Sequence, residues 1–226
     1  MNVKILSYTE DPVYVGGVAA RCCTSEEIPV VPIQVYETER NHRAFHHAMD
    51  SGHHSVAEHI TFTFAIEGIS RACSHQLVRH RMASYSQQSQ RYVNMDRFEY
   101  VKPPSIPDDK LFNGEDNARI FANIMYELEC TYKSMIEAGI PEEDARYILP
   151  NATCTNIVMT VNLRELIHIA ELRLCTRAQW EIRELVEKMV ECVVELDEAY
   201  AQWLVPQCQR LGYCPEKRGC GKVAKR

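Results

Sequence analysis

The stretch RHRMASYSQQSQR, residues 79–91, places three arginines and one histidine among hydroxyl and amide side chains. No carboxylate in the stretch neutralises this positive charge. Guanidinium groups bind phosphate through two parallel hydrogen bonds, and seryl hydroxyls such as that of Ser89 complete such a site. The stretch therefore indicates a site for a phosphate-bearing ligand. The alternative is a solvated helix end whose arginines pair with distant acidic residues.

The sequence around this stretch predicts strands and helices in alternation. Apolar residues alternate over ITFTFAIEG (60–68), which predicts a strand ending at Gly68. Residues 69–81 have a helical pattern, and a short strand near 90–93 would place Ser89 and Arg91 on one face. The other expected segments are strands at 3–8 and 152–161, a proline loop at 102–109, and helices at 37–52, 115–138, 141–149, 162–173 and 178–204, the last being the longest.

These patterns favour one mixed domain of the α/β (α+β) class, with a central β-sheet flanked by long helices and spanning 1–226. Hydrophobic residues make up 46% of the 226 residues, enough for a sizeable core. The basic segment at about 207–226 is expected to be a mobile tail. No G-x-G-x-x-G follows a strand, so a nucleotide would be held in a non-Rossmann manner.

Charge and hydropathy restrict the class of partner and the location. The net charge is −6, so a basic face for nucleic acid is not expected beyond the arginine cluster and the last ten residues. The N-terminus becomes acidic too early for a signal peptide, and no apolar run approaches the roughly 20 residues of a membrane span. We therefore expect a cytoplasmic protein with no membrane partner and free thiols.

Two further clusters invite a metal interpretation that their spacing does not favour. GHHSVAEH (52–59) lacks the His-Glu-x-x-His spacing of zinc proteases. Cys208, Cys214 and Cys220 are six residues apart, whereas zinc sites usually contain close Cys-x-x-Cys pairs. No metal site is therefore predicted.

Four segments, taken in order, resemble the flavin-dependent thymidylate synthases. Arg79-His80-Arg81, followed after seven residues by Ser89 and then Arg91, is similar to the signature of that family. GHHSVAEH, TVNLRELIHIAELR (160–173) and RAQWEIREL (177–185) are similar to its other segments. The resemblance implies a homotetramer with active sites shared between subunits. It also implies methylation of dUMP to dTMP with 5,10-methylenetetrahydrofolate as carbon donor, and with NADPH and FAD as the source of reducing equivalents.

The resemblance also implies roles for individual residues. Residues expected at FAD are Ser55, Arg79, His80, Arg81, Gln87, Asn162, Leu163, Arg164 and His168. Residues expected at dUMP are Gln76, Leu77, Val78, Arg79, Gln87, Gln88, Ser89, Gln90, Arg91, Arg146 and Arg173. Catalytic roles fall to Arg173 at the pyrimidine, to His53 near the flavin and folate, and to Ser89.

Two positions depart from relatives of this kind, which often carry Glu at position 87 and sometimes Asn at 168. Gln87 brings no charge, and His168 can titrate near neutral pH. No cysteine lies in the segments around the nucleotide cations, and an unactivated seryl hydroxyl is a weak nucleophile, so we expect chemistry without a covalent enzyme–substrate bond. The remaining alternatives are another flavoprotein or nucleotide-modifying enzyme on the same scaffold, and a nucleic-acid-binding protein that uses 79–91 as a basic patch.

Overall fold

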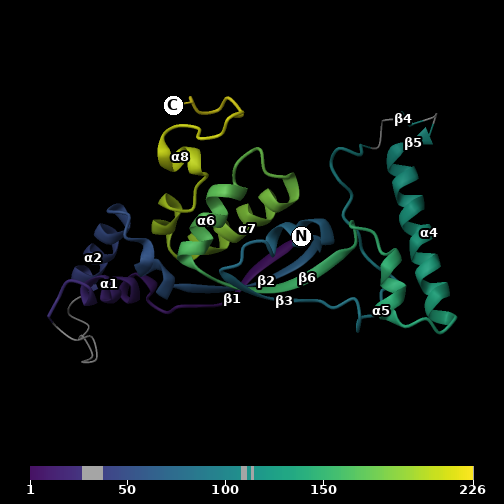
Figure 1. The fold of residues 1–226 in the computed structure, drawn as a ribbon, viewed down its shortest axis with the longest axis horizontal. Coiled ribbons are helices and arrows are strands. Elements are labelled where there is room, and N and C mark those ends of the chain that lie inside the picture. The colour runs from purple at the N-terminus through teal and green to yellow at the C-terminus, as the bar shows by residue number, and fades with distance from the viewer. Residues whose placement is uncertain (27–37, 108–110, 113–114, 226) are drawn as a thin grey trace. The chain divides into compact units, whose positions relative to one another are not determined.

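The computed structural model describes residues 1–26, 38–107, 111–112 and 115–225, drawn as a ribbon in Figure 1. In chain order its elements are β1 (Asn2–Tyr8), α1 (Pro12–Cys22), α2 (Thr38–Asp50), η2 (His54–His59), β2 (Thr61–Ser70), α3 (Arg71–Leu77), β3 (Ala83–Gln87), β4 (Leu111–Phe112), β5 (Glu115–Asp116), α4 (Asn117–Glu137), α5 (Glu142–Ala145), η3 (Arg146–Ile148), β6 (Cys154–Asn162), α6 (Leu163–Arg173), α7 (Trp180–Leu196), η4 (Glu198–Gln202) and α8 (Gln207–Leu211). The η elements are 3-10 helices. The expected mixture of strands and helices is confirmed.

Four strands form one sheet in the order β1-β2-β6-β3. The end of β1 meets the start of β2, where the Thr9 amide donates to the Thr61 carbonyl at 3.0 Å. Along β2 and β6, Thr63 contacts Thr160 through their hydroxyls at 3.0 Å. In both pairs a residue near the end of one strand lies beside a residue near the start of the other, which is the antiparallel arrangement. The sheet is therefore antiparallel across these pairs.

The chain divides into two compact units, which are described separately. The first comprises Met1–Asn2, Ile66–Arg79 and Ser86–Ile157, and the second comprises Val3–Ala65, His80–Tyr85 and Val158–Arg226. Because the strands β2, β3 and β6 continue from one unit into the other, each unit contains part of the sheet.

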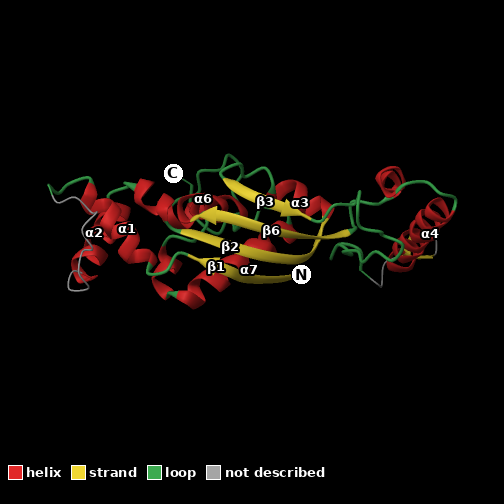
Figure 2. Ribbon diagram, turned by 90° about the horizontal axis from the view of Figure 1, so that it is seen from below, coloured by secondary structure: helices red, strands yellow, loops and turns green. Residues whose placement is uncertain are grey.

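In the second unit, α6 and α7 cover one face of the sheet (Figures 1 and 2). Alternate residues of the strands point to that face and are buried, among them Phe62, Phe64 and Met159. The helices contribute buried Leu166 and Leu185, on stripes at helical spacing. Removing this apolar surface from water is the main force that holds the helices on the sheet.

Helices α1 and α2 pack closely in the same unit because α1 has glycines at the crossing. A Cβ on Gly17 would lie 2.1 Å from the Asn41 carbonyl oxygen, and a Cβ on Gly16 would lie 2.4 Å from the Phe45 ring. Arg21 donates from Nη1 to Oδ1 of Asn41 at 3.0 Å, with both side chains buried. Helix α1 is not anticipated from the sequence patterns described above.

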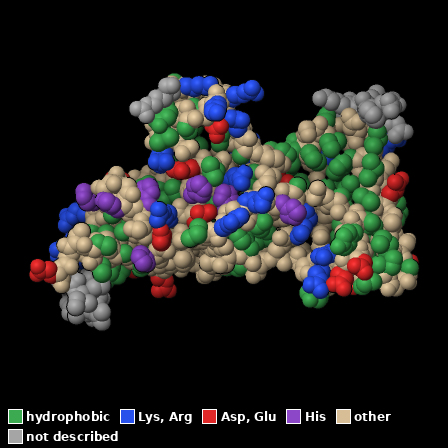
Figure 3. Space-filling model, viewed as in Figure 1, with side chains coloured by type: hydrophobic (Ala, Val, Ile, Leu, Met, Phe, Trp, Pro, Cys, Tyr) green, Lys and Arg blue, Asp and Glu red, His purple; other side chains and the backbone are tan. Residues whose placement is uncertain are grey.

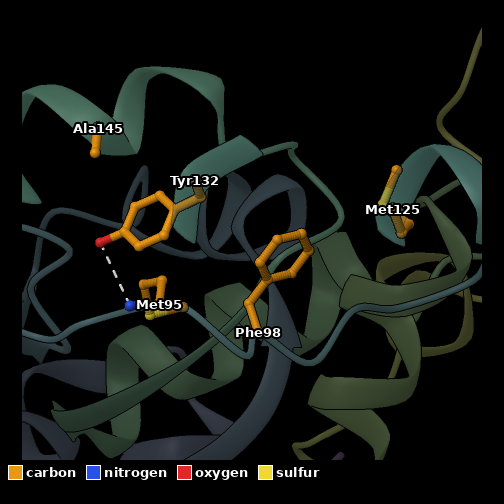
Figure 4. Close-up of a cluster of buried hydrophobic side chains, with 5 residues drawn as sticks. All are labelled: Met95, Phe98, Met125, Tyr132 and Ala145. Carbon is orange, nitrogen blue, oxygen red and sulfur yellow. Dashed lines mark hydrogen bonds between the residues drawn. The ribbon is translucent and has the colours of Figure 1, made fainter. Parts of the chain in front are cut away.

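The first unit has its own small core, formed where α4 and α5 meet the segment that follows β3. Figure 4 shows its five buried residues, and the Tyr132 hydroxyl accepts a hydrogen bond from the Met95 amide at 3.4 Å. Asp116 caps α4 by accepting from the Ala118 amide at 2.8 Å, and Gly139 follows its end with a φ of 85°. The predicted helix over 115–138 is confirmed.

One predicted element is wrong, and two helices are shorter than expected. The segment 90–93 is a turn, and the neighbouring strand is β3, which ends at Gln87. The helix predicted over 178–204 ends at Leu196, because Asp197 is extended at φ −158° and its carboxylate caps η4. Helix α3 spans only part of the range 69–81, since Ser70 caps its start. Among the helices of the described residues, none is both long and apolar enough to cross a membrane.

Candidate functional site

The start of α6 places polar side chains on one side of the second unit. Asn162 accepts a hydrogen bond from the Glu165 amide at 2.9 Å through its side chain and so caps α6, which agrees with the helix predicted over 162–173. Arg164 and His168 follow on the next turn and are exposed. Residues four apart on a helix lie on the same face. The sequence thus fixes these groups at the N-terminal half of one short helix.

These side chains line a cavity of about 390 Å³ together with η2. His54 and Glu58 of η2 face Asn162, Arg164 and His168 across it. Two ion pairs join residues that line the cavity, Arg164 with Glu58 and Arg210 with Glu171. Histidine and basic side chains gather over α6 on the face drawn in Figure 3.

The donors of this cavity suit the phosphates and hydroxyls of a dinucleotide. Guanidinium groups offer a planar pair of donors to phosphate. Asn162 and His168 add polar groups from the same helix, although the Asn162 oxygen already caps α6. The residues present therefore fit the flavin cofactor that the sequence resemblance implies.

The opposite end of α6 holds Arg173 against His80. Nε of Arg173 donates to Nε2 of His80 at 3.1 Å, and His80 is buried while Arg173 is partly exposed. On the other side of the ring, Nδ1 of His80 lies 3.6 Å from a Glu165 carboxylate oxygen. The Tyr85 hydroxyl donates to the His80 carbonyl at 2.8 Å. His80 is thus held by three contacts. Its ring lies between Glu165 in the first turn of α6 and Arg173 at the end of that helix.

The protonation state of His80 follows from its surroundings. Burial lowers the pKa of His80 to about 4, and the nearby Arg173 and His168 contribute to the same shift. The imidazole is therefore neutral at neutral pH, so Nε2 carries the lone pair that accepts from Arg173, and Nδ1 carries the proton facing Glu165. Burial also raises the pKa of Glu165 and of the Tyr85 hydroxyl.

In the first unit, two arginines expected at the substrate meet at Glu143. Arg91 forms an ion pair with the Glu143 carboxylate, with Nη2 and Oε2 2.9 Å apart and both side chains about half exposed. Arg146 donates from Nε to the Glu143 carbonyl at 2.9 Å. Burial and the charge of Arg146 lower the pKa of Arg71. Arg71 therefore lies near Arg146, while the first turn of α5 carries three carboxylates, those of Glu142, Glu143 and Asp144.

Ser89 and the glutamines beside it occupy a turn rather than a strand. The Ser89 hydroxyl accepts from the Arg91 amide at 3.2 Å, which replaces the strand pairing we expected. Gln87 donates from Nε2 to the hydroxyls of Ser74 and Thr155 at 3.1 and 3.2 Å. Nε2 of Gln90 is buried and has no hydrogen-bond partner among the described residues. A buried amide of this kind is an open donor for a ligand.

The other residues expected at the ligands differ in exposure. Leu77 and Leu163 are fully buried, main chain included. The Leu163 amide already donates to the Ile60 carbonyl at 2.7 Å, and the Gln88 amide to the Asn156 carbonyl at 2.9 Å. The exposed or partly exposed members are His53, Ser55, Gln76, Val78, Arg79 and Arg81.

Several residues of these two clusters were not identified from the sequence. Glu165 lies within the segment 160–173 but was given no role, and Arg71 and Glu143 carry no motif. His54 and Glu58 were considered as metal ligands, whereas they line the cavity at α6. Among the described residues, no three His, Cys, Asp or Glu side chains are placed to hold a metal ion together.

Comparison with known proteins identifies the family. The family model described as thymidylate synthase complementing protein matches residues 4–197. A flavin-dependent thymidylate synthase of Geobacter sulfurreducens is 43% identical, covering 100% of this chain and 96% of that protein. Proteins of the same name from Pyrococcus abyssi and Clostridium tetani are 49% and 40% identical, covering 76% and 100% of this chain and 73% and 95% of the relatives. The chain therefore belongs to the family of the flavin-dependent thymidylate synthases.

Proposed function

We propose that this protein makes dTMP from dUMP by reductive methylation, with 5,10-methylenetetrahydrofolate as the carbon donor and NADPH as the reductant. By its family the protein is a flavin-dependent thymidylate synthase, and its cofactor is FAD. The observation that carries the proposal is the convergence of Asn162, Arg164 and His168 on one cavity with η2. These are the residues that the family resemblance assigns to the flavin.

The cofactor is held in a non-Rossmann manner in this proposal. Arg164 and His168 bind its phosphates, and Asn162 and Ser55 add hydrogen bonds from the start of α6 and from η2. The other residues that the resemblance assigns to FAD are Arg79, His80, Arg81, Gln87 and Leu163. When bound, the flavin carries reducing equivalents from NADPH to the one-carbon unit. Arg164 would exchange its Glu58 partner for phosphate, since exposed ion pairs of this kind are weak.

The phosphate of dUMP binds to the arginines of the first unit. Arg91 and Arg146 are the expected ligands, and Arg71 adds positive charge beside Arg146. Glu143 holds Arg91 in the absence of substrate, and a phosphate carries more charge than a carboxylate and offers more acceptor oxygens. The open amide of Gln90 supplies a further donor to the nucleotide.

Arg173 acts on the pyrimidine. Uracil reacts as a nucleophile at C5 when negative charge is drawn onto its N3–O4 edge, and a cation there stabilises that charge most in the transition state. The guanidinium of Arg173 is a planar fork that matches two acceptors on one edge of a ring. Its Nε is held by neutral His80, so the orientation of the fork is set before substrate binds.

The proposed chemistry needs no covalent bond between enzyme and substrate. The contacts of the Ser89 hydroxyl are those of a turn, since it accepts from the Arg91 amide. A serine acts as a nucleophile when a neighbouring base removes its proton. Ser89 is therefore proposed as a hydrogen-bonding residue at the nucleotide, and His53 as a polar residue near the flavin and folate.

We further propose a cytoplasmic homotetramer with shared sites. The cavity at α6 is about 390 Å³, near the lower end of the roughly 300–1,000 Å³ of ligand pockets, which is small for a dinucleotide. A second subunit would complete it. Sedimentation of the protein with and without FAD tests this proposal, because a ligand bound across subunits stabilises the assembly by mass action. A monomer that binds FAD stoichiometrically and turns over would contradict it.

The proposed activity is tested by supplying dUMP, methylenetetrahydrofolate, FAD and NADPH together and then leaving out one at a time. We expect dTMP only in the complete mixture. Added FAD is not needed where FAD stays bound to the protein through purification. Formation of dTMP that does not depend on FAD, or a protein that binds FAD but makes no dTMP, would reject the proposal.

A further inference from the structure

A second cavity of the second unit, of about 530 Å³, is lined by sulfur. It lies between the C-terminal end of α6 and the segment 206–223. Four of the ten cysteines of the chain line it, namely Cys175, Cys208, Cys214 and Cys220. The proposed function uses none of these thiols. The three evenly spaced cysteines noted in the sequence therefore line one cavity, together with Cys175, which follows the end of α6.

We propose that this cavity is a site of thiol–disulfide exchange, in which Cys220 attacks a small anionic disulfide and Cys214 resolves the product. A metal is not favoured, because no three His, Cys, Asp or Glu side chains among the described residues are placed to hold one. Disulfides of intracellular proteins are commonly transient ones of this kind.

Cys220 has the surroundings of a reactive thiol. It is exposed, whereas the other three cysteines of the cavity are partly buried. A hydrogen bond from the Thr176 side chain lowers the pKa of the Cys220 thiol, and the Lys222 amide and the Lys222 charge add to this shift. The thiolate is the form that attacks a disulfide.

The other exposed cysteines lie in different surroundings. Cys22 is the last residue of α1 and Cys23 follows it, and neither lines the cavity. Cys130 is exposed on α4, where its neighbours include Glu129 and the hydroxyl of Tyr126. These three thiols are therefore suitable internal controls for Cys220.

The charge of the cavity selects the kind of disulfide. Arg173, Arg177 and Lys222 line it as cations, against the carboxylates of Glu171 and Glu216. Both carboxylates are engaged, since Glu216 pairs with Arg177 at 2.9 Å and Glu171 pairs with Arg210. A disulfide with carboxylate groups is therefore expected to bind better than a neutral one.

Cys214 is the second thiol because its sulfur lies beside the residue that precedes Cys220. A Cβ built on Gly219 would be 3.0 Å from Sγ of Cys214. In the first step the Cys220 thiolate forms a bond with one sulfur of the small disulfide and expels the other as a thiolate. In the second step the Cys214 thiol attacks Cys220, forms the Cys214–Cys220 disulfide, and releases a second thiolate and a proton.

The test uses dithiobis(nitrobenzoate), an anionic disulfide whose released thiolate is coloured, added near neutral pH to the full-length protein. We expect a fast phase of colour release that Cys220→Ser slows at least about tenfold, as loss of the low-pKa thiolate implies. Cys130→Ser is the matched control and should leave the fast phase intact. A fast phase that persists in Cys220→Ser, or that disappears in Cys130→Ser, would overturn the proposal.

The resolving step has its own measurement. Mass spectrometry of the wild-type protein after the fast phase should show a peptide pair joined by Cys214–Cys220 and no bound nitrobenzoate. Cys214→Ser should keep the fast release and accumulate the nitrobenzoate adduct on Cys220. A wild-type protein that accumulates that adduct would contradict resolution by Cys214. A neutral disulfide that reacts as fast as the anionic one would contradict the assigned ligand class.

Discussion

Nε of Arg173 donates a 3.1 Å hydrogen bond to Nε2 of His80, a buried and neutral histidine. Because the acceptor is neutral, this hydrogen bond does not offset the charge of the guanidinium. The opposite nitrogen of the ring lies 3.6 Å from Glu165, on the helix that ends with Arg173. His80 is therefore a positioning residue for Arg173 in this account.

Replacing His80 with leucine should disturb Arg173 without removing its charge. A hydrogen bond to a charged group contributes about 1.5–3 kcal/mol, which corresponds to roughly a 10- to 100-fold lower kcat if it is needed in the transition state. His80→Gln, which retains an acceptor, should recover part of the loss. Steady-state kinetics of dTMP formation at saturating dUMP and FAD measure the effect.

The matched control is His75→Leu, because His75 is an exposed histidine on α3. It should retain wild-type kcat. If His80→Leu lost FAD but kept its kcat when FAD was restored, His80 would be a cofactor ligand rather than a positioning residue.

The stability of the protein should depend on pH through His80. Its pKa is about 4 in the folded protein and near 6.5 in the unfolded chain. Between these two pH values the unfolded state therefore binds more protons than the folded state. The contribution of His80 to the free energy of unfolding is complete above pH 6.5 and declines as the pH falls toward 4. At about 1.4 kcal/mol per pKa unit, this difference of about 2.5 corresponds to a loss of at most about 3.5 kcal/mol.

Urea unfolding at several pH values between these limits measures the free energy of unfolding. His80→Leu should have a smaller slope with pH than the wild type, since other groups contribute equally to both. Equal slopes would mean that His80 is not buried in its neutral form.

Glu143 should compete with the substrate for Arg91. The pair is about half exposed, so Glu143→Gln is expected to change the free energy of unfolding by less than about 1 kcal/mol. It should lower the KM for dUMP a few-fold, because the phosphate no longer displaces a carboxylate. Glu137→Gln is the matched control, since Glu137 pairs with Lys133 on α4 at similar exposure. An unchanged KM in Glu143→Gln would remove Arg91 from the phosphate site.

Ser89→Ala should keep measurable activity if no covalent nucleophile is used. The loss of one hydroxyl that accepts from the Arg91 amide should weaken the turn and reduce kcat/KM by about tenfold, as for one hydrogen bond. No single Cys→Ala variant should abolish turnover. Complete loss of activity in a folded variant that still binds dUMP would contradict this prediction.

Local sequence patterns predicted those helices and strands whose structure is determined by the residues within them. Alternating apolar residues located β2, and the helix predicted over 162–173 corresponds to α6. The end of α7 at Leu196 was missed because apolar residues continue at helical spacing beyond it. The helix ends there because Asp197 has an extended backbone and its carboxylate caps η4. The turn at Ser89 was missed for a similar reason, since an Asx- or serine-type turn competes with a strand over a few residues.

The candidate site was predictable only in part. The motif located Arg173, His80 and Arg91, but their partners depend on tertiary structure. Glu143 lies 52 residues from Arg91, and the pairing of Arg164 with Glu58 joins residues 106 apart. Such distant pairs leave no local pattern, and the neutral state of His80 follows only from its burial.

The most direct test of the central claim compares dTMP formation by the wild type and Arg173→Ala at saturating dUMP, methylenetetrahydrofolate, FAD and NADPH. We expect the wild type to turn over and Arg173→Ala to keep its fold and FAD but to lose dTMP formation and some affinity for dUMP. Arg173→Lys should recover little, because a point charge does not reproduce a planar fork. Near-normal turnover of Arg173→Ala under these conditions would contradict the account.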